Sequence, residues 1–120
     1  MKAVLDASAL LAWFGDEPGA EEVDRCVASF CSTANWSEVV QKLVSRGVAL
    51  EDIQASVALL GLAFEPVTLR DAETAALLWA RWRTLSLADR LCLALGQRLK
   101  LSVLTADRAW GNEAPVVQIR

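Results

Sequence analysis

Short apolar runs alternate with longer amphipathic segments along the whole chain, and this alternation most limits what the chain can fold into. The segments between successive apolar runs are too long for hairpins, and their own apolar residues recur at helical spacing. Strands joined by such helical crossovers form a parallel sheet covered by helices. The pattern therefore predicts one α/β domain over residues 1–120, a three-layer α/β/α sandwich with four to five mainly parallel strands.

Individual elements follow from the same pattern. Strands are expected within residues 2–6, 30–33, 64–69, 101–105 and 115–119, the last of them at an edge of the sheet. Helices are expected over residues 7–14, 18–29, 35–47, 50–61, 70–84 and 86–98. Asn35 is the expected N-cap of the third helix, and Gly47 marks its end.

The chain has no histidine and three cysteines, Cys26, Cys31 and Cys92. The lack of histidine excludes Ser-His-Asp and Cys-His catalysis, histidine-ligated zinc and histidine general bases. An odd number of cysteines without a C-x-x-C pair favours free thiols over disulfides or zinc. Acid–base chemistry must therefore depend on carboxylates, on lysines or on a bound metal ion.

Hydropathy bears on location and assembly. The chain has no apolar run long enough to span a membrane and no signal-peptide pattern, so we expect a cytoplasmic protein without membrane contact. Apolar residues make up 54% of the sequence, which is more than a small domain can bury. We therefore expect an interface with a second copy or with a dedicated partner.

Four acidic residues stand at the edges of expected elements. Asp6 ends the first strand, Asp107 follows the strand at 101–105, and Glu38 and Asp89 each lie in the first turn of a helix. Open α/β sheets carry their sites at the carboxyl ends of the strands. Crowded carboxylates repel each other unless a cation is bound, and oxygen ligands select Mg²⁺ or Mn²⁺. The four acids together predict a metal site for phosphoryl or phosphodiester transfer.

Each acid taken alone also has a purely structural interpretation. Asp89 stands three residues after Ser86, which is the spacing of a capping box, and an acid in the first turn also suits the helix dipole. The metal site is favoured because all four acids lie at element edges rather than within ordinary surface runs.

Four stretches resemble, in order, the successive motifs of PIN-domain ribonucleases, and most closely those of the VapC toxins of bacterial toxin–antitoxin pairs. They are VLDASALLAWF (4–14), NWSEVVQKL (35–43), LSLADRLCLALGQRL (85–99) and SVLTADRAW (102–110). The resemblance extends over the whole chain, and the acid of each motif is present. It implies that the metal ligands and catalytic residues are Asp6, Glu38, Asp89 and Asp107.

The resemblance also implies an activity and partners. Such proteins are Mg²⁺- or Mn²⁺-dependent endoribonucleases that cut tRNA or ribosomal RNA, form homodimers and are inhibited by a VapB antitoxin whose C-terminal segment blocks the site. Ser8 and Thr105 match hydroxyl residues that accompany the first and last acids, where they would orient a carboxylate or a water. Some relatives carry a further acid where this chain has Arg108, Ala109 and Trp110, so the number of metal ions stays open.

Several alternatives remain at this point. Ser8 could instead cap a helix, and Thr105 could simply end a strand. Arg90 and Arg108, beside the last two acids, are candidates for RNA phosphate contacts. Trp79 and Trp82, three residues apart on an expected helix, suit either the core or a partner.

Two other function classes are also open. One is a non-catalytic RNA- or protein-binding module on the same fold. The other is a Mg²⁺-binding phosphoacceptor signalling domain, which would need a lysine after a late strand, and the stretch SVLTADRAWG has none.

Overall fold

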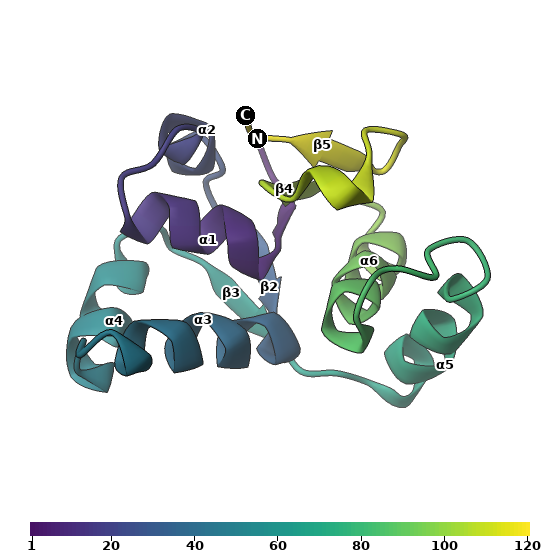
Figure 1. The fold of residues 1–120 in the computed structure, drawn as a ribbon, viewed down its shortest axis with the longest axis horizontal. Helices are drawn as coiled ribbons and strands as arrows, with labels where there is room; N and C mark the ends of the chain where they lie inside the picture. Colours follow the sequence, from purple (N-terminus) through teal and green to yellow (C-terminus); the bar gives the residue numbers. More distant parts are fainter.

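The computed structural model describes residues 1–120, and a five-stranded, fully parallel sheet forms its centre (Figure 1). The strand order is β3-β2-β1-β4-β5. The strands are β1 (Val4–Leu5), β2 (Phe30–Ser32), β3 (Ala63–Glu65), β4 (Val103–Thr105) and β5 (Val116–Gln118). The predicted α/β architecture is confirmed, and all five expected strands are present.

Six α-helices and one short 3₁₀ helix connect the strands. They are α1 (Ala7–Phe14), α2 (Ala20–Asp24), α3 (Thr33–Ser45), α4 (Leu50–Ala58), α5 (Leu69–Leu78), α6 (Leu87–Leu99) and the 3₁₀ helix η1 (Arg108–Trp110). Figure 1 shows α1 to α4 on one side of the sheet and α5 and α6 on the other. No helix combines the length and the apolar character that crossing a membrane requires.

The two faces of the sheet build two separate cores. Leu5 and Leu104 pack with residues of α1, α3 and α4, whereas the preceding residues Val4 and Val103 pack with Cys92, Leu93 and Leu95 of α6. This division follows from the two-residue period of a strand, because neighbouring side chains point to opposite faces. A sheet buried on both faces explains why the strands are continuously apolar.

The register of the two central strands brings their ends together. Val4 pairs with Val103 and Leu5 with Leu104, so Asp6 and Thr105 both follow at the carboxyl edge of the sheet. The Asp6 backbone N–H donates to the Leu104 carbonyl at 3.1 Å. The central strands thus deliver two polar side chains to one point from opposite ends of the sequence.

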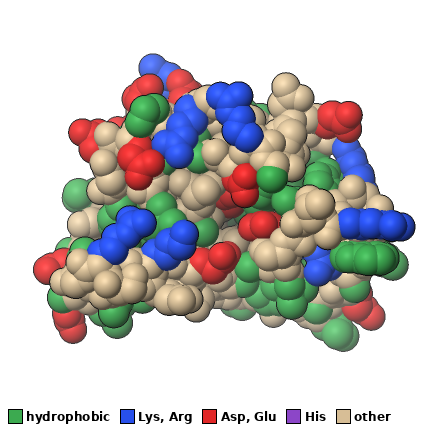
Figure 2. All heavy atoms as spheres, in the orientation of Figure 1, with side chains coloured by type: hydrophobic (Ala, Val, Ile, Leu, Met, Phe, Trp, Pro, Cys, Tyr) green, Lys and Arg blue, Asp and Glu red, His purple; other side chains and the backbone are tan.

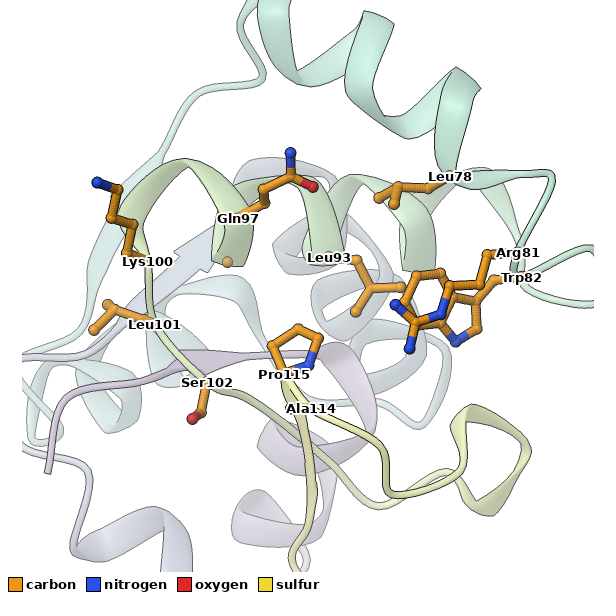
Figure 3. A pocket seen from close by; sticks show the side chains of 11 residues that line it. Leu78, Arg81, Trp82, Leu93, Gln97, Lys100, Leu101, Ser102, Ala114 and Pro115 are labelled. Atoms are coloured by element: carbon orange, nitrogen blue, oxygen red, sulfur yellow. The ribbon is translucent and has the colours of Figure 1, made fainter.

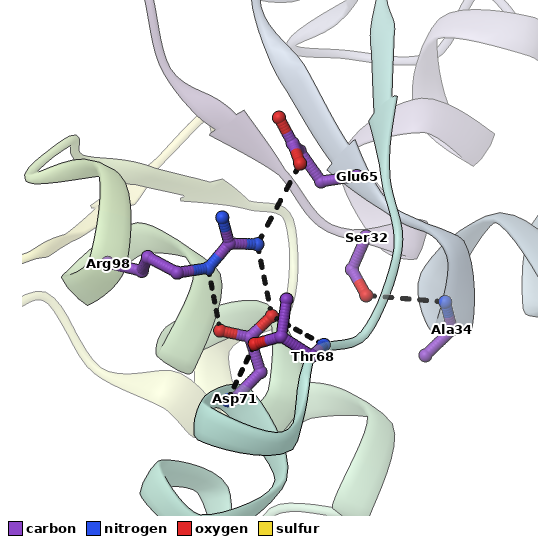
Figure 4. Close-up of polar contacts among 6 residues, drawn as sticks. All are labelled: Ser32, Ala34, Glu65, Thr68, Asp71 and Arg98. Carbon is purple, nitrogen blue, oxygen red and sulfur yellow. Dashed lines mark hydrogen bonds and ion pairs between the residues drawn. The ribbon is translucent and has the colours of Figure 1, made fainter.

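Three local predictions are wrong. Ser32, not Asn35, is the N-cap of α3; its hydroxyl accepts from the Ala34 N–H at 3.2 Å (Figure 4). The helix expected at 18–29 is only the five residues of α2. The helix expected at 70–84 ends at Leu78, so Trp79 and Trp82 do not share a helix. For the two shortened helices, the apolar period continues past the point where the backbone turns, whereas α3 starts earlier than expected because it begins directly at the end of β2.

The turn before β2 offers a test of backbone strain. Ala28 is exposed and has φ of 57°, the left-handed region that disfavours a residue with a Cβ atom. We expect Ala28→Gly to raise the free energy of unfolding by about 1 kcal/mol, measured by urea denaturation. The matched control, Ala55→Gly on the exposed face of α4, should lower it by about 1 kcal/mol. A loss of stability in both variants would contradict the expectation.

A partly buried ion pair joins α5 to α6 (Figure 4). Arg98 donates to both carboxylate oxygens of Asp71, from Nε at 2.8 Å and from Nη2 at 3.1 Å, and it lies 3.8 Å from Glu65 at the end of β3. Asp71 also forms a capping box with Thr68. Burial acts to raise the pKa of Asp71, but the hydrogen bonds from Arg98 and Thr68 outweigh it, so its pKa is lowered.

Candidate active site

A cavity of about 230 Å³ lies at the carboxyl edge of the sheet, between α1, α3 and α6. Its lining contains all four sequence-predicted acids and five other residues: Asp6, Ala7, Ser8, Leu11, Glu38, Lys42, Ser86, Asp89 and Asp107. The four acids are supplied by four separate segments of the chain, so only the folded protein brings them together. The structure therefore assembles the predicted acidic residues around one space.

Asp6 is the most buried of the four acids, with 2% of its surface exposed. It is the N-cap of α1, where its Oδ1 accepts from the Ala9 N–H at 2.8 Å. Burial raises the pKa of Asp6 to about 6, with a smaller contribution from the charge of Asp89, although hydrogen bonds from Thr105, Ala9 and Ser8 oppose the rise. The ionised carboxylate thus lies where a nearby cation would stabilise it.

Two hydroxyl groups hold the Asp6 carboxylate. Thr105 donates to Oδ2 at 2.5 Å, and the Ser8 hydroxyl lies 2.8 Å from Oδ1 and 2.9 Å from Oδ2. The same hydroxyls accept from the backbone N–H groups of Asp107 and Ala106, respectively. Ser8 and Thr105 therefore link the end of β1 to the end of β4. Asp6, rather than Ser8, is the residue that caps α1.

Glu38 is held by a buried asparagine that the sequence analysis assigned to a different role. The Asn35 amide donates to Glu38 Oε1 at 3.2 Å and to the carbonyl of Ala88, next to Asp89, also at 3.2 Å. Asn35 is fully buried, and its Oδ1 has no hydrogen-bond partner. Its amide therefore fixes the position of α3 and Glu38 relative to the first turn of α6.

Asp89 combines a capping contact with a place in the lining of the acidic cavity. It closes a capping box with Ser86, which is the N-cap of α6: the Ser86 hydroxyl accepts from the Asp89 N–H, and Asp89 Oδ2 accepts from the Ser86 N–H. It also lines the acidic cavity. Burial raises the pKa of Asp89, as does the charge of Asp107, while the hydrogen bonds with Ser86 lower it.

Asp107 lines the cavity, and Arg108 follows it as the first residue of η1. Asp107 is exposed and caps η1, with Oδ1 accepting from the Ala109 N–H at 2.9 Å. The Arg108 side chain is exposed and belongs to none of the five ion pairs in the structure. It remains available as a phosphate contact.

Arg90, in contrast, is used inside the fold. It is only partly exposed, and its Nη1 donates to the Ala75 carbonyl of α5 at 2.8 Å. This contact joins α6 to α5 through Nη1, while the buried Nε has no hydrogen-bond partner. The sequence assigned it to RNA because it follows Asp89, but on a helix the next residue points about 100° away.

The donor set of the cavity fits a hard divalent cation. Glu38, Asp89 and Asp107 each use one carboxylate oxygen in a protein hydrogen bond and keep the other without a donor. No group of three or more acidic, cysteine or histidine side chains lies close enough to form a ready-made metal site. Mg²⁺ typically takes one or two protein carboxylates and completes its shell with water and substrate, so a pair of these acids is sufficient.

Sequence reasoning missed two residues of this site, Lys42 and Asn35. Lys42 follows Glu38 by four residues, which places both on one face of α3. That spacing is visible in the sequence and could have identified it. No local signal could have identified Asn35 as the link to Ala88, because the two residues are 53 positions apart.

A larger cavity of about 450 Å³ lies elsewhere, between α6 and the segments that lead into β4 and β5 (Figure 3). Apolar residues such as Trp82, Leu93 and Pro115 line it together with polar ones, and Arg81 and Lys100 lie toward its ends. No acidic residue lines it. The four acids predicted from the sequence therefore line the smaller cavity and not this one.

Two solved structures have a fold similar to that of this chain. The chain is similar to a protein in a toxin–antitoxin complex from Klebsiella pneumoniae, with 20% sequence identity, a TM-score of 0.82 and 98% of each chain covered. It is also similar to a chain of VapBC2 from Rickettsia felis bound to a DNA fragment from their promoter, with 13% identity, a TM-score of 0.69, and 98% of this chain and 97% of that chain covered. None of the curated proteins matches the sequence significantly.

The sequence itself identifies the family. Residues 3–112 match the PIN domain, a span that runs from the start of β1 through η1 and includes all four acids of the cavity. The five-stranded parallel sheet agrees with the fold of the two solved structures. The chain belongs to the PIN domain family.

Proposed function

We propose that this protein is a Mg²⁺- or Mn²⁺-dependent endoribonuclease and the VapC-like toxin of a toxin–antitoxin pair. The observation that carries the proposal is the gathering of Asp6, Glu38, Asp89 and Asp107 around one cavity at the carboxyl edge of the sheet. PIN domains are generally nucleases, and the site has the hard oxygen donors that these two cations prefer.

The four acids and Arg108 would have different roles in binding the metal ion and the RNA. Asp6, fixed by Ser8 and Thr105, supplies the most rigid carboxylate, and Asp89, Asp107 and Glu38 supply oxygens that no protein donor occupies. Bound there, the cation would polarise a water and neutralise charge on the scissile phosphate. Arg108, exposed beside Asp107, is positioned to bind the RNA backbone.

The lack of histidine bears on the products. Ribonucleases that use the RNA 2′-OH as nucleophile without a metal generally need a general base and a general acid to move its proton. This chain has no histidine to fill either role, so external water is the proposed nucleophile. Cleavage should leave a 5′-phosphate and a 3′-hydroxyl.

We further propose an antitoxin partner and a homodimer. The two similar solved structures are toxin–antitoxin complexes. Leu59, Leu69 and Leu77 are each about four-fifths exposed, at 83%, 78% and 80%, and Leu87, beside the cavity residue Ser86, is 58% exposed. A complex with an antitoxin or a second copy would cover leucines of this kind, for example Leu87 at the start of α6.

The test is cleavage by purified protein free of any antitoxin. We expect it to cut tRNA or ribosomal RNA only when Mg²⁺ or Mn²⁺ is added and to stop when EDTA is added. End-labelling of the fragments should reveal 5′-phosphates. Fragments ending in a 2′,3′-cyclic phosphate, or activity that survives EDTA, would refute the mechanism. Metal-loaded protein that binds these RNAs and cuts none of them would favour a non-catalytic binding module.

A further inference from the structure

Lys42 is the only basic side chain among the nine residues that line the acidic cavity. It lies in the last turn of α3, four residues after Glu38, and it is exposed. None of the five ion pairs in the structure includes Lys42, so its ammonium group is more than 4.0 Å from every carboxylate oxygen. The fold therefore leaves this charge beside the acids without pairing it.

The acids around the cavity repel RNA, so an unpaired cation beside them bears on how RNA could bind there. Figure 2 shows acidic side chains at the middle of the face turned to the viewer, with basic side chains above them and to their lower left. A polyanion that approaches the acids is repelled, and the chain as a whole carries a net charge of −3. Binding of RNA at this place needs cations at the rim in addition to the metal ion.

We propose that Lys42 binds a phosphate oxygen of the RNA on the α3 side of the cavity. This role rests on the proposed function, since it concerns the substrate of the same site. Lysine acts on a phosphate as a mobile point charge, and four methylene groups let the ammonium group of an exposed residue follow the backbone. Lys42 of α3 would then act together with Arg108 of η1, which follows the cavity residue Asp107.

Lys42 also has two purely structural explanations, and both predict a different result from the proposed phosphate contact. A cation in the last turn suits the helix dipole, and a lysine four residues after a glutamate stabilises a helix. Either role would affect stability alone. A phosphate-binding lysine beside a metal site has two effects of opposite sign, because its charge attracts RNA and repels the divalent cation.

The experiment compares wild type with Lys42→Ala, Lys42→Gln and Lys42→Arg. Affinity for Mn²⁺ alone is measured by electron paramagnetic resonance. Affinity for a fluorescent single-stranded RNA oligonucleotide is measured by anisotropy with saturating Ca²⁺, and RNA cleavage is measured separately with Mn²⁺. Lys2→Ala is the matched control, because Lys2 is exposed, precedes β1 and lies outside the cavity.

We expect Lys42→Ala and Lys42→Gln to weaken RNA binding about tenfold, as loss of a charge-assisted hydrogen bond does. Mn²⁺ binding should stay equal or tighten up to about fivefold. Lys42→Arg should retain most RNA affinity, and Lys2→Ala should match wild type in both measurements.

RNA affinity that falls no further than in Lys2→Ala overturns the proposal. Weaker binding of both Mn²⁺ and RNA overturns it as well, because Lys42 would then be holding the carboxylates in place. Wild type that binds RNA with this dependence on Lys42 but cuts none contradicts only the proposed nuclease activity. Wild type that binds no RNA contradicts both.

Discussion

Asp6→Asn is expected to reduce RNA cleavage by at least about a hundredfold, the usual cost of removing an electrostatic group from an active site. Asp6 is the acid that the fold holds most firmly, through Ser8, Thr105 and the Ala9 N–H. Asparagine keeps the shape and the oxygen that caps α1 but removes the charge that would bind a cation. The measurement is the cleavage rate at saturating Mn²⁺.

The same substitution is expected to stabilise the protein when no metal is present. The pKa of Asp6 rises from the usual 3.8 to about 6 because the carboxylate is buried. Between these pH values only the folded state holds the proton, so wild-type stability falls as the pH rises from about 4 to about 6 and stays low above that. At pH 7.5 this amounts to about 3 kcal/mol, of which asparagine should recover 1–2 kcal/mol after losing part of the hydrogen bonding.

Thermal melts with EDTA and with Mn²⁺ test the expected stabilisation and the role of Asp6 in metal binding. With EDTA at pH 7.5, Asp6→Asn should melt above wild type, and the difference should shrink as the pH is lowered toward 4. Added Mn²⁺ should raise the melting temperature of wild type but not that of the variant, because ligands stabilise only the state that binds them. An equal effect of Mn²⁺ on both proteins would remove Asp6 from the set of metal ligands.

Arg98→Met is expected to lower the free energy of unfolding by about 3 kcal/mol without changing the acidic cavity. The side chain of Asp71 is only 5% exposed, whereas that of Arg98 is 26% exposed. Removing the cation leaves the Asp71 carboxylate buried and without its charge partner, which typically costs 3–5 kcal/mol, and the partial exposure of Arg98 places this pair at about the lower end of that range. Urea denaturation at pH 7 measures the loss.

A double variant separates the pair from the rest of the fold. Asp71→Asn together with Arg98→Met removes both charges and should recover about half of the loss, since no uncompensated charge remains. In wild type, the pKa of Asp71 is lowered, so the stability from this pair is present above the usual pKa of aspartate and disappears as the pH falls below it. If Arg98→Met is as stable as wild type at pH 7, the ion pair contributes nothing.

The extent of each element depended on contacts that the sequence does not display locally. The periodicity of 70–84 continues through Trp79 and Trp82, but the chain turns after Leu78, and the Arg81 guanidinium lies 4.0 Å from the centre of the Trp82 ring. Asparagine is a residue type that often caps helices. Asn35 is nevertheless buried inside α3, because the helix begins directly at the end of β2 with Ser32 as its cap. The capping preference of one residue cannot reveal that the helix begins earlier, at the end of the preceding strand.

Local sequence was sufficient for features that depend on near neighbours. The alternation of apolar runs and helical segments predicts the parallel sheet, and the spacing of Ser86 and Asp89 predicts a capping box that the structure contains. The positions of the four acids at element ends predict where each would lie relative to its own strand or helix. The capping box and the element ends extend over a few residues, where backbone geometry and hydrogen bonding are nearly independent of the rest of the chain. The parallel direction of the strands follows because segments of helical length separate them.

Tertiary structure alone decided how those pieces meet. The order β3-β2-β1-β4-β5 places the ends of β1 and β4 side by side, so Ser8 and Thr105, 97 residues apart, lie 3.1 Å from each other and hold Asp6. The same packing brings Asn35 to Ala88 and Lys42 to the rim of the cavity. Such contacts depend on the register of strands and the packing of helices across the whole core, and no short stretch of sequence carries that information.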